Sequence, residues 1–330
     1  MSAILGHDPA IASFLAAWRG GAMHHAWLIA GQRGIGKASF ARAAAKRILA
    51  EAAGHVSADA PLDIDPATPT ARFIDSDGGS AHPDFVQVER GLNKSGTAPA
   101  RNITVDQIRD LAGLFERTPA LSPWRAVVID SVDDLEKGAA NALLKMLEEP
   151  PANCLFLLVS HVPGRLLPTI RSRCRTLAFA ALDDDAMTSV LARALPDLDE
   201  SRRRALVESA GGSAGRALAL AALDLDPLRA DALALMRQGD PSNARRARLM
   251  QALTGRNSAE RYAAFLDLAP ALIATEARHL DGDARLRALD AYGEARELGR
   301  LAPRLSLDPA TTAFRLGAIL ASVAEGGPAR

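Results

Sequence analysis

Four short segments of this 330-residue chain carry side chains that could bind a phosphate group and act on it. A glycine-rich loop that ends in lysine spans Gly31–Lys37, and an apolar run ends in Asp130. A second apolar run ends in Ser160, and Arg171–Arg175 is a basic segment. Loop amides, a lysine and a carboxylate that holds Mg²⁺ are the groups with which proteins bind nucleoside triphosphates. The chemistry to consider is therefore phosphoryl transfer.

The glycine-rich loop fits the phosphate-binding pattern G-x-x-x-x-G-K-[ST] except at its last position. The glycines that let its backbone curl around phosphate oxygens are Gly31, Gly34 and Gly36. Lys37 would reach the terminal phosphates, but Ala38 stands where a hydroxyl would bind Mg²⁺. Ser39 cannot replace that hydroxyl, since one helical step turns a side chain by ~100°. A nucleotide-binding loop and a glycine turn that has lost this role both stay open.

The second acidic segment supplies a carboxylate but lacks a base for hydrolysis. Residues 127–130 form a predicted buried strand that delivers Asp130 at its carboxyl end, beside the glycine-rich loop in a parallel sheet. The next residue usually supplies the water-activating glutamate, and here it is Ser131, a poor base near neutral pH. We interpret Asp133 and Asp134 as N-cap and first-turn acids of the next helix. Ala38 and Ser131 are independent losses, and they argue against hydrolysis by this chain alone.

The basic segment Arg171–Arg175 reads RSRCR and follows a predicted strand. A guanidinium on a turn can stabilise charge on a phosphoryl group that is transferred in a neighbouring subunit. Three arginines in a loop also form an ordinary solvated surface. By residue type alone, both interpretations stay open.

Strands that alternate with helices would position these segments. The predicted strands are residues 26–30, 85–88, 126–129, 155–159 and 176–179. The predicted helices among them are residues 8–18, 38–49, 105–117 and 135–148, with a short helical turn at 165–170. Because parallel strands need crossover helices, this alternation predicts a mostly parallel sheet covered by helices on both faces.

After Leu182 the strand pattern stops and only helical patterns follow. We expect an α/β domain over residues 1–181, a small helical unit over 182–225 and an all-helical domain over 226–330. Residues 52–80 are rich in Pro, Asp, Ala and Gly without periodicity, which predicts an irregular insertion in the first domain. Helix breaks are expected at Pro196, Gly211, Gly239, Gly255, Gly282 and Pro303.

The composition is typical of a soluble globular protein, with 48% hydrophobic and 24% charged residues. Lys plus Arg equals Asp plus Glu at 39 each, whereas proteins that bind phosphate backbones non-specifically usually carry a basic excess. Met1–Pro9 has no signal-peptide pattern, and no apolar run approaches ~18 residues. The only cysteines are Cys154 and Cys174. We therefore expect a cytoplasmic protein with a protein partner, rather than a DNA-binding module or a membrane protein.

Two segments closely resemble subunits of the bacterial DNA polymerase III clamp loader, an AAA+ family. They are Asn141–Pro151, which reads NALLKMLEEPP, and Ser172–Cys174. The resemblance covers at least residues 26–220 and implies an AAA+ P-loop domain, a helical lid and a helical collar within a five-subunit ring. Delta-prime subunits are more similar than the gamma/tau ATPase, since the catalytic motifs are degenerate, the arginine is kept and His82-Pro83-Asp84 is present.

The resemblance implies a role for each candidate residue. Arg173 would be an arginine finger that acts in trans on a gamma/tau ATP site. Arg216 matches a second nucleotide sensor, although it equally suits an exposed first-turn residue. The other candidates, in a degenerate nucleotide site, are Gly31, Gly34, Gly36, Lys37, Asp130 and Ser160. The chain would act as a non-hydrolysing stator with gamma/tau and delta subunits, which load the sliding clamp onto primed DNA during replication.

The main alternative is an active gamma/tau-like ATPase in which Asp133 or Asp134 replaces the missing glutamate. We expect that no cofactor is required, and weak binding of ATP or ADP stays open because Lys37 and the loop glycines are kept. Relatives often carry a four-cysteine zinc module after the helix that follows the loop. Residues 51–80 contain no cysteine, and His55 alone cannot form a tetrahedral site. We therefore predict no zinc or other metal site.

Overall fold

The computed structural model describes residues 4–76, 81–92, 96, 100–223, 225–254 and 258–324. The end of the predicted insertion at 77–80 and the predicted break at Gly255 lie outside these residues. The chain forms two compact units, Met1–Gly215 and Arg216–Arg330. The division falls inside helix α10 (Ala214–Ala222), within the segment 182–225 that we expected to be a small helical unit.

The first unit is built on one parallel sheet, which contains five strands in the described part of the chain. The strands are β1 (Ala26–Ala30), β2 (Phe85–Glu89), β3 (Arg125–Asp130), β4 (Cys154–Ser160) and β5 (Arg175–Ala178). Their order across the sheet is β2-β3-β4-β1-β5, and each neighbouring pair is parallel. The α/β fold with a parallel sheet is therefore confirmed.

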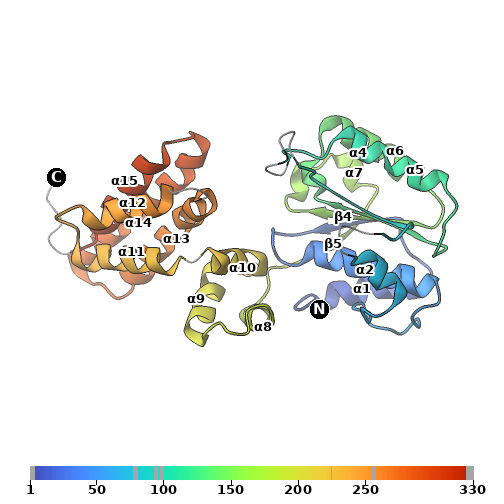
Figure 1. The fold of residues 1–330 in the computed structure, drawn as a ribbon, viewed down its shortest axis with the longest axis horizontal. Helices are drawn as coiled ribbons and strands as arrows, with labels where there is room; N and C mark the ends of the chain where they lie inside the picture. The colour runs from blue at the N-terminus through green and yellow to red at the C-terminus, as the bar shows by residue number, and fades with distance from the viewer. Residues whose placement is uncertain are drawn as a thin grey trace. The chain divides into compact units, whose positions relative to one another are not determined.

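Helices cover both faces of this sheet (Figure 1). Helices α1 (Asp8–Arg19) and α2 (Lys37–Ala52) pack on one face, against β3 side chains such as Val128. The opposite face, with Val127, is covered by α4 (Val105–Arg109), α5 (Leu111–Glu116), α6 (Lys137–Glu148) and α7 (Pro168–Arg171). Both faces of the strands are apolar because both are buried, and this is why the strands read as continuous apolar runs.

The predicted helix over 105–117 is divided into α4 and α5 at Asp110. Asp110 keeps helical backbone angles (φ −59°, ψ −23°), so the chain direction does not reverse there. The amide of Gly113 bonds to the Asp110 carbonyl, three residues back rather than four. Glycine is a poor helix former, which is consistent with a local change of helical pitch at this point.

Residues 52–80, which we predicted to be irregular, contain helix α3 (Pro69–Ile74), so the prediction is wrong for these six residues. Leu62 and Ile64 of the same segment are buried. The guanidinium of Arg47, on α2, is also fully buried. It donates hydrogen bonds to the carbonyls of Ser57, Ala58 and Ala60 and to the carboxylate of Glu51. Scattered apolar side chains and one buried arginine hold this segment in place. Its sequence therefore shows no hydrophobic periodicity.

The remaining described elements are helices. The first unit ends with α8 (Asp184–Ala194), α9 (Glu200–Ala210) and the start of α10. The second unit continues with α11 (Asp226–Gln238), α12 (Ala244–Thr254), α13 (Ala259–Ala277), α14 (Gly282–Arg304) and α15 (Pro309–Ala321). In this unit α13 packs along α14, and α12 packs along α15 (Figure 1). None of the described helices has the length and the apolar character needed to cross a membrane.

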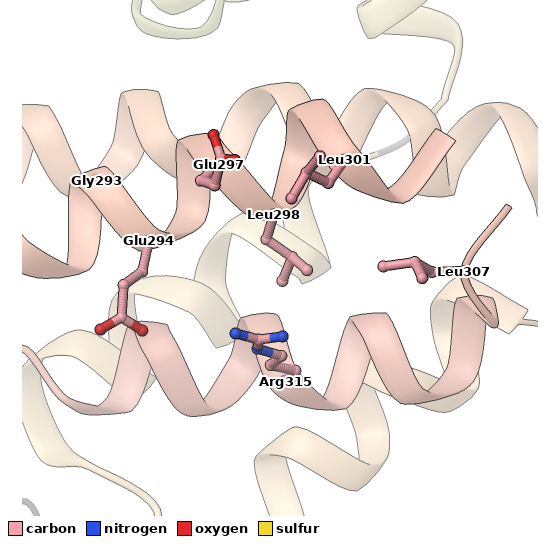
Figure 2. Close-up of a pocket in the computed structure, with 7 residues that line it drawn as sticks. All are labelled: Gly293, Glu294, Glu297, Leu298, Leu301, Leu307 and Arg315. Carbon is pink, nitrogen blue, oxygen red and sulfur yellow. The ribbon is translucent and has the colours of Figure 1, made fainter. Parts of the chain in front are cut away.

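A groove of about 310 Å³ lies between α14 and α15 in the second unit (Figure 2). Its lining residues are Gly293, Glu294, Glu297, Leu298, Leu301, Leu307 and Arg315. Figure 2 shows Leu298 of α14 and Arg315 of α15 pointing toward each other across it. None of the residues that we predicted to contact a nucleotide lines this groove.

Candidate functional site

Parallel pairing brings three of the predicted segments to one edge of the sheet. β1 lies between β4 and β5, and Ala30 at its end is in register with Ser160 at the end of β4. Asp130 at the end of β3 is in register with Val159 of the same β4 strand. The glycine-rich loop that follows β1 therefore starts beside Ser160, one strand away from Asp130. This carboxyl edge is where open α/β sheets bind ligands.

Three positions of the loop have a backbone that requires glycine. Gly34 (φ +79°) and Gly36 (φ +98°) adopt left-handed angles that other residues rarely adopt. A Cβ at Gly31 would lie 2.4 Å from the carbonyl oxygen of Phe179, so only glycine fits there. Helix α2 begins at Lys37, and its N-cap residue, Gly36, has no side chain to cap the first amides. The loop therefore combines a glycine-dependent backbone with a helix N-terminus, the two features with which phosphate-binding loops bind anions.

The ammonium group of Lys37 is turned back onto the loop itself. Its Nζ donates to the carbonyl oxygens of Gly31 (2.7 Å) and Gln32 (2.5 Å), and the residue is only 3% exposed. Burial lowers the pKa of Lys37 from 10.5 to about 8, while the negative charges of Asp130 and Asp133 oppose that shift. A phosphate would have to take the place of the loop carbonyls as the partner of this group.

A turn from later in the chain is bonded to the same loop. The side-chain amide of Gln32 donates to the carbonyl of Gly211 (2.9 Å). The hydroxyl of Ser213 donates to the Arg33 carbonyl (2.9 Å), and the amide of Gly215 donates to the Gly34 carbonyl (2.8 Å). Three successive loop residues are thus fixed by residues 211–215, which follow α9. A Cβ at position 215 would lie 2.9 Å from the Cα of Gly34, so this close approach requires glycine.

The N-terminal segment contacts the loop through His7, a residue that sequence reasoning missed. Its Nε2 lies 2.7 Å from the carbonyl oxygen of Ile35, to which it donates a proton. The imidazole also packs against Phe179 with 4.4 Å between ring centroids. Burial lowers the pKa of His7, which favours the neutral ring. No local pattern marks this histidine, because its partner is 28 residues away in sequence.

Asp130 is in the position predicted for a metal-binding carboxylate. Burial raises its pKa, and the nearby positive charges of His161, Lys37 and Arg33 oppose that shift. Next to it, Ser131 is 2% exposed, and its hydroxyl has no hydrogen-bond partner in the described part of the structure. The residue that stands in the place of the water-activating glutamate is therefore a buried hydroxyl.

Asp133 and Asp134 do not cap the next helix, and our interpretation of them was wrong. They lie in a 3₁₀ turn, η1 (Val132–Asp134), whereas α6 begins three residues later at Lys137. The Asp134 carboxylate pairs with the guanidinium of Arg90 (3.3 Å). The parallel register places the turn after β3 next to the end of β4. Asp133 therefore bonds to the end of β4 and does not cap a helix.

The carboxylate of Asp133 accepts three hydrogen bonds from the end of β4. The donors are the Ser160 hydroxyl (2.9 Å), the His161 amide (2.5 Å) and the Val162 amide (3.3 Å). Ser160, a predicted nucleotide-binding residue, is fully buried and uses its proton on this bond. An acid that already accepts three bonds is poorly placed to take a proton from water.

Arg173 lies just after α7 and is one-third exposed. Its Nη2 pairs with Glu148 Oε1 at 2.8 Å, and its Nη1 donates to the Thr169 carbonyl at 3.0 Å. Glu148 is the last residue of α6 and is about half exposed. The next residue, Cys174, packs against the core of this sheet face, and burial raises the pKa of its thiol to about 12. The turn is therefore anchored by Cys174 while it presents Arg173.

Arg216, the predicted second sensor, belongs to the second unit by its contacts. It lies in the first turn of α10, and its guanidinium is 3.7 Å from the Asp267 carboxylate of α13. Its role as a sensor stays a prediction.

The His82-Pro83-Asp84 segment lies before β2, at the opposite end of the strand from the carboxyl edge of the sheet. The buried Asp84 carboxylate accepts hydrogen bonds from three successive amides, those of Ala120, Leu121 and Ser122. These bonds fix the loop that leads into β3, so the segment serves the fold.

Residues 51–80, the segment considered above for a zinc module, are packed by other contacts where the structure describes them. His55 Nδ1 lies 2.9 Å from the Thr70 hydroxyl. Among the described residues, no three His, Cys, Asp or Glu side chains gather as a metal site would require. The absence of zinc stays a prediction.

Comparisons with known proteins agree with the motifs. Residues 6–183 match the family described as "DNA polymerase III, delta subunit". The chain is 36% identical over 198 residues to DNA polymerase III subunit delta' of Pseudomonas aeruginosa, which covers 59% of this chain and 55% of that protein. It is 32% identical over 215 residues to the delta' subunit of Escherichia coli, which covers 64% and 59%. The resemblance to delta-prime subunits is therefore confirmed.

Other matches extend to gamma and tau subunits. The tau subunit of Bacillus subtilis is 31% identical over 200 residues, which covers 59% of this chain and 32% of that protein. A crystal structure of a gamma subunit-related protein from Thermotoga maritima covers 93% of this chain and 98% of that one, at 15% identity and a TM-score of 0.46. The chain spans a little over half the length of the first curated delta' relative that it matches.

Proposed function

We propose that this chain, which belongs to the DNA polymerase III delta subunit family, is a delta-prime-type subunit of a cytoplasmic clamp loader. In this role it binds gamma/tau and delta subunits, and the assembly opens the sliding clamp and places it on primed DNA. The chain acts as a stator that hydrolyses no ATP itself. It supplies Arg173 in trans to an ATP site of a neighbouring gamma/tau subunit.

One observation carries this proposal: the chain lacks the catalytic groups of its own site but presents an arginine at the surface. Ala38 offers no hydroxyl to Mg²⁺, and Ser131 is a buried hydroxyl in place of a base. The nearest substitute, Asp133, already accepts three hydrogen bonds. Two nitrogens of the Arg173 guanidinium bond within the chain, and its remaining N–H donors meet no acceptor among the residues that the structure describes, so they can bind an anion.

The residues at the sheet edge fit the phosphates of a nucleotide only in part. The loop backbone, the N-terminus of α2 and Lys37 would hold the phosphates, and bound Mg²⁺ would neutralise their charge. Asp130 is one carboxylate for such an ion, but no hydroxyl follows Lys37 to complete it. The bonds from residues 211–215 to the loop support a fixed conformation of the loop.

Reconstitution of the complex tests the proposal. The chain is combined with gamma/tau and delta subunits, and DNA- and clamp-stimulated ATP turnover is measured for wild type, Arg173→Ala and the control Arg171→Ala. Removal of a trans arginine lowers turnover by roughly 10³-fold at the site it serves, so the complex should lose most of the turnover from that site. Assembly, followed by size-exclusion chromatography, should not change. Equal turnover with Arg173→Ala and with Arg171→Ala would remove the proposed role.

The active gamma/tau-like ATPase is the second candidate, because Lys37 and the loop glycines are kept and tau subunits are among the matches. An ATPase assay of the purified chain alone distinguishes the two candidates. We expect no Mg²⁺-dependent turnover from it, whereas turnover that Asp133→Asn abolishes would establish the ATPase and overturn the stator role.

A further inference from the structure

We propose that Glu148 is a positioning residue for Arg173: it holds the guanidinium in the orientation in which it meets the phosphates of a neighbouring subunit. The inference rests on the proposed role of Arg173 and adds the residue on which its geometry depends. Glu148 lies at the carboxyl end of α6, 25 positions before the arginine, and the pair spans two elements.

The contact geometry distinguishes Arg173 from the other two arginines of its turn. The guanidinium carbon of Arg175 lies 4.8 Å from the centre of the Trp27 ring, so this side chain is stacked against the domain. Arg171 makes no ion pair with any residue that the structure describes. Arg173 is held at two points, by the Glu148 carboxylate at 2.8 Å and by the Thr169 carbonyl at 3.0 Å.

Two contacts on different nitrogens determine the plane of a guanidinium, whereas one contact leaves it free to rotate. A free arginine loses much rotamer entropy when it binds, and a preorganised one loses less. Of these two contacts, the Thr169 carbonyl comes from α7, close to Arg173 in sequence. The Glu148 carboxylate comes from a separate element, α6. Without Glu148 the guanidinium would keep a single local bond.

The strength of the pair suits a positioning role. Both side chains are partly exposed, with 34% and 48% of their surface accessible, and such pairs are weak because water screens them. A phosphate can therefore bind the free N–H groups, or shift the arginine slightly, without a large loss of interaction. A deeply buried partner would instead hold Arg173 away from any ligand.

Glu149 offers a matched control, because it is the adjacent acid, is exposed and has the same charge. Single-site variants are assayed in the reconstituted complex. Glu148→Ala should lower kcat for ATP by about five-fold, as expected for a misplaced catalytic group held by a partly exposed pair. Glu148→Gln keeps an acceptor oxygen and should recover part of the loss, and Glu149→Ala should have no effect.

The double variant separates a positioning role from a structural one. In the Arg173→Ala background, Glu148→Ala should change kcat no further, because Glu148 affects the reaction only through Arg173. An additional loss there, or a rise in kcat with Glu148→Ala alone, would overturn the inference; the rise would mean that Glu148 competes with phosphate. If Arg173→Ala itself leaves turnover unchanged, the proposed function fails. If Arg173→Ala lowers turnover and Glu148→Ala does not, only the positioning role fails.

Discussion

Arg47 is the residue whose removal should destabilise the first unit most specifically. It is a fully buried arginine on α2, and its guanidinium bonds to Glu51 and to the carbonyls of residues 57, 58 and 60. These bonds attach the segment before α3 to the helix that follows the glycine-rich loop. Arg47→Met fills a similar volume without a hydrogen-bond donor, so the variant isolates the polar contacts.

The magnitude follows from the groups that would be left without partners. Loss of one member of a buried ion pair costs ~3–5 kcal/mol. Ser57 and Ala58 are exposed, so their carbonyls can bond to water instead. The Glu51 carboxylate keeps the bond from the indole N–H of Trp18 at 2.8 Å. These partial replacements place Arg47→Met near the lower end of the range, at about 3 kcal/mol in the free energy of unfolding.

Tryptophan fluorescence during urea unfolding measures this unit by itself. The chain has three tryptophans, Trp18, Trp27 and Trp124, and all lie within the first unit. Arg72→Met is the matched control, because Arg72 is an exposed arginine on α3 of the attached segment, and its loss should change stability by less than ~0.5 kcal/mol.

The stabilities of the two variants together test whether the buried contacts of Arg47 hold the attached segment. A fall of less than ~1 kcal/mol for Arg47→Met would show that the buried guanidinium contributes no more than an average hydrogen bond. Equal effects of Arg47→Met and Arg72→Met would also refute the reasoning, because the segment would then not depend on the buried contacts.

The pKa of Lys37 is lowered from 10.5 to about 8, so between these values the unfolded chain binds more protons than the folded one, and stability should rise with pH. Lys37→Met should remove this rise. Unfolding curves of the wild type and the variant at pH 7.5 and 9.5 measure it, and an equal rise in stability in both proteins would contradict the prediction. Burial raises the pKa values of Cys154 and Cys174 to about 12, so neither thiol should react with a thiol reagent at pH 8 until the chain is unfolded in urea. Rapid labelling of Cys174 in the native protein would show that its turn opens.

Local sequence patterns were sufficient for much of the fold. Continuous apolar runs identified the strands, since a strand buried on both faces has no polar side to interrupt the run. The glycine pattern also located the loop after β1, because left-handed backbone angles at Gly34 and Gly36 require that residue type. The helix within 69–74 was missed because a six-residue helix is too short to show a period.

The sequence by itself determined which chemical groups the chain has: a loop lysine, an aspartate at the end of β3, no hydroxyl at position 38, no glutamate at 131, and an arginine at 173. The tertiary structure decided what those groups contact. Parallel strands bring residues far apart in sequence to one edge, so Asp133 meets Ser160. The packing of the turn after α9 brings residues 211–215 to the loop. The Arg173–Glu148 pair likewise depends on how α6 packs beside α7. Residue types are local, whereas hydrogen-bond partners depend on the packing of distant elements, and for that reason only the folded chain specifies them.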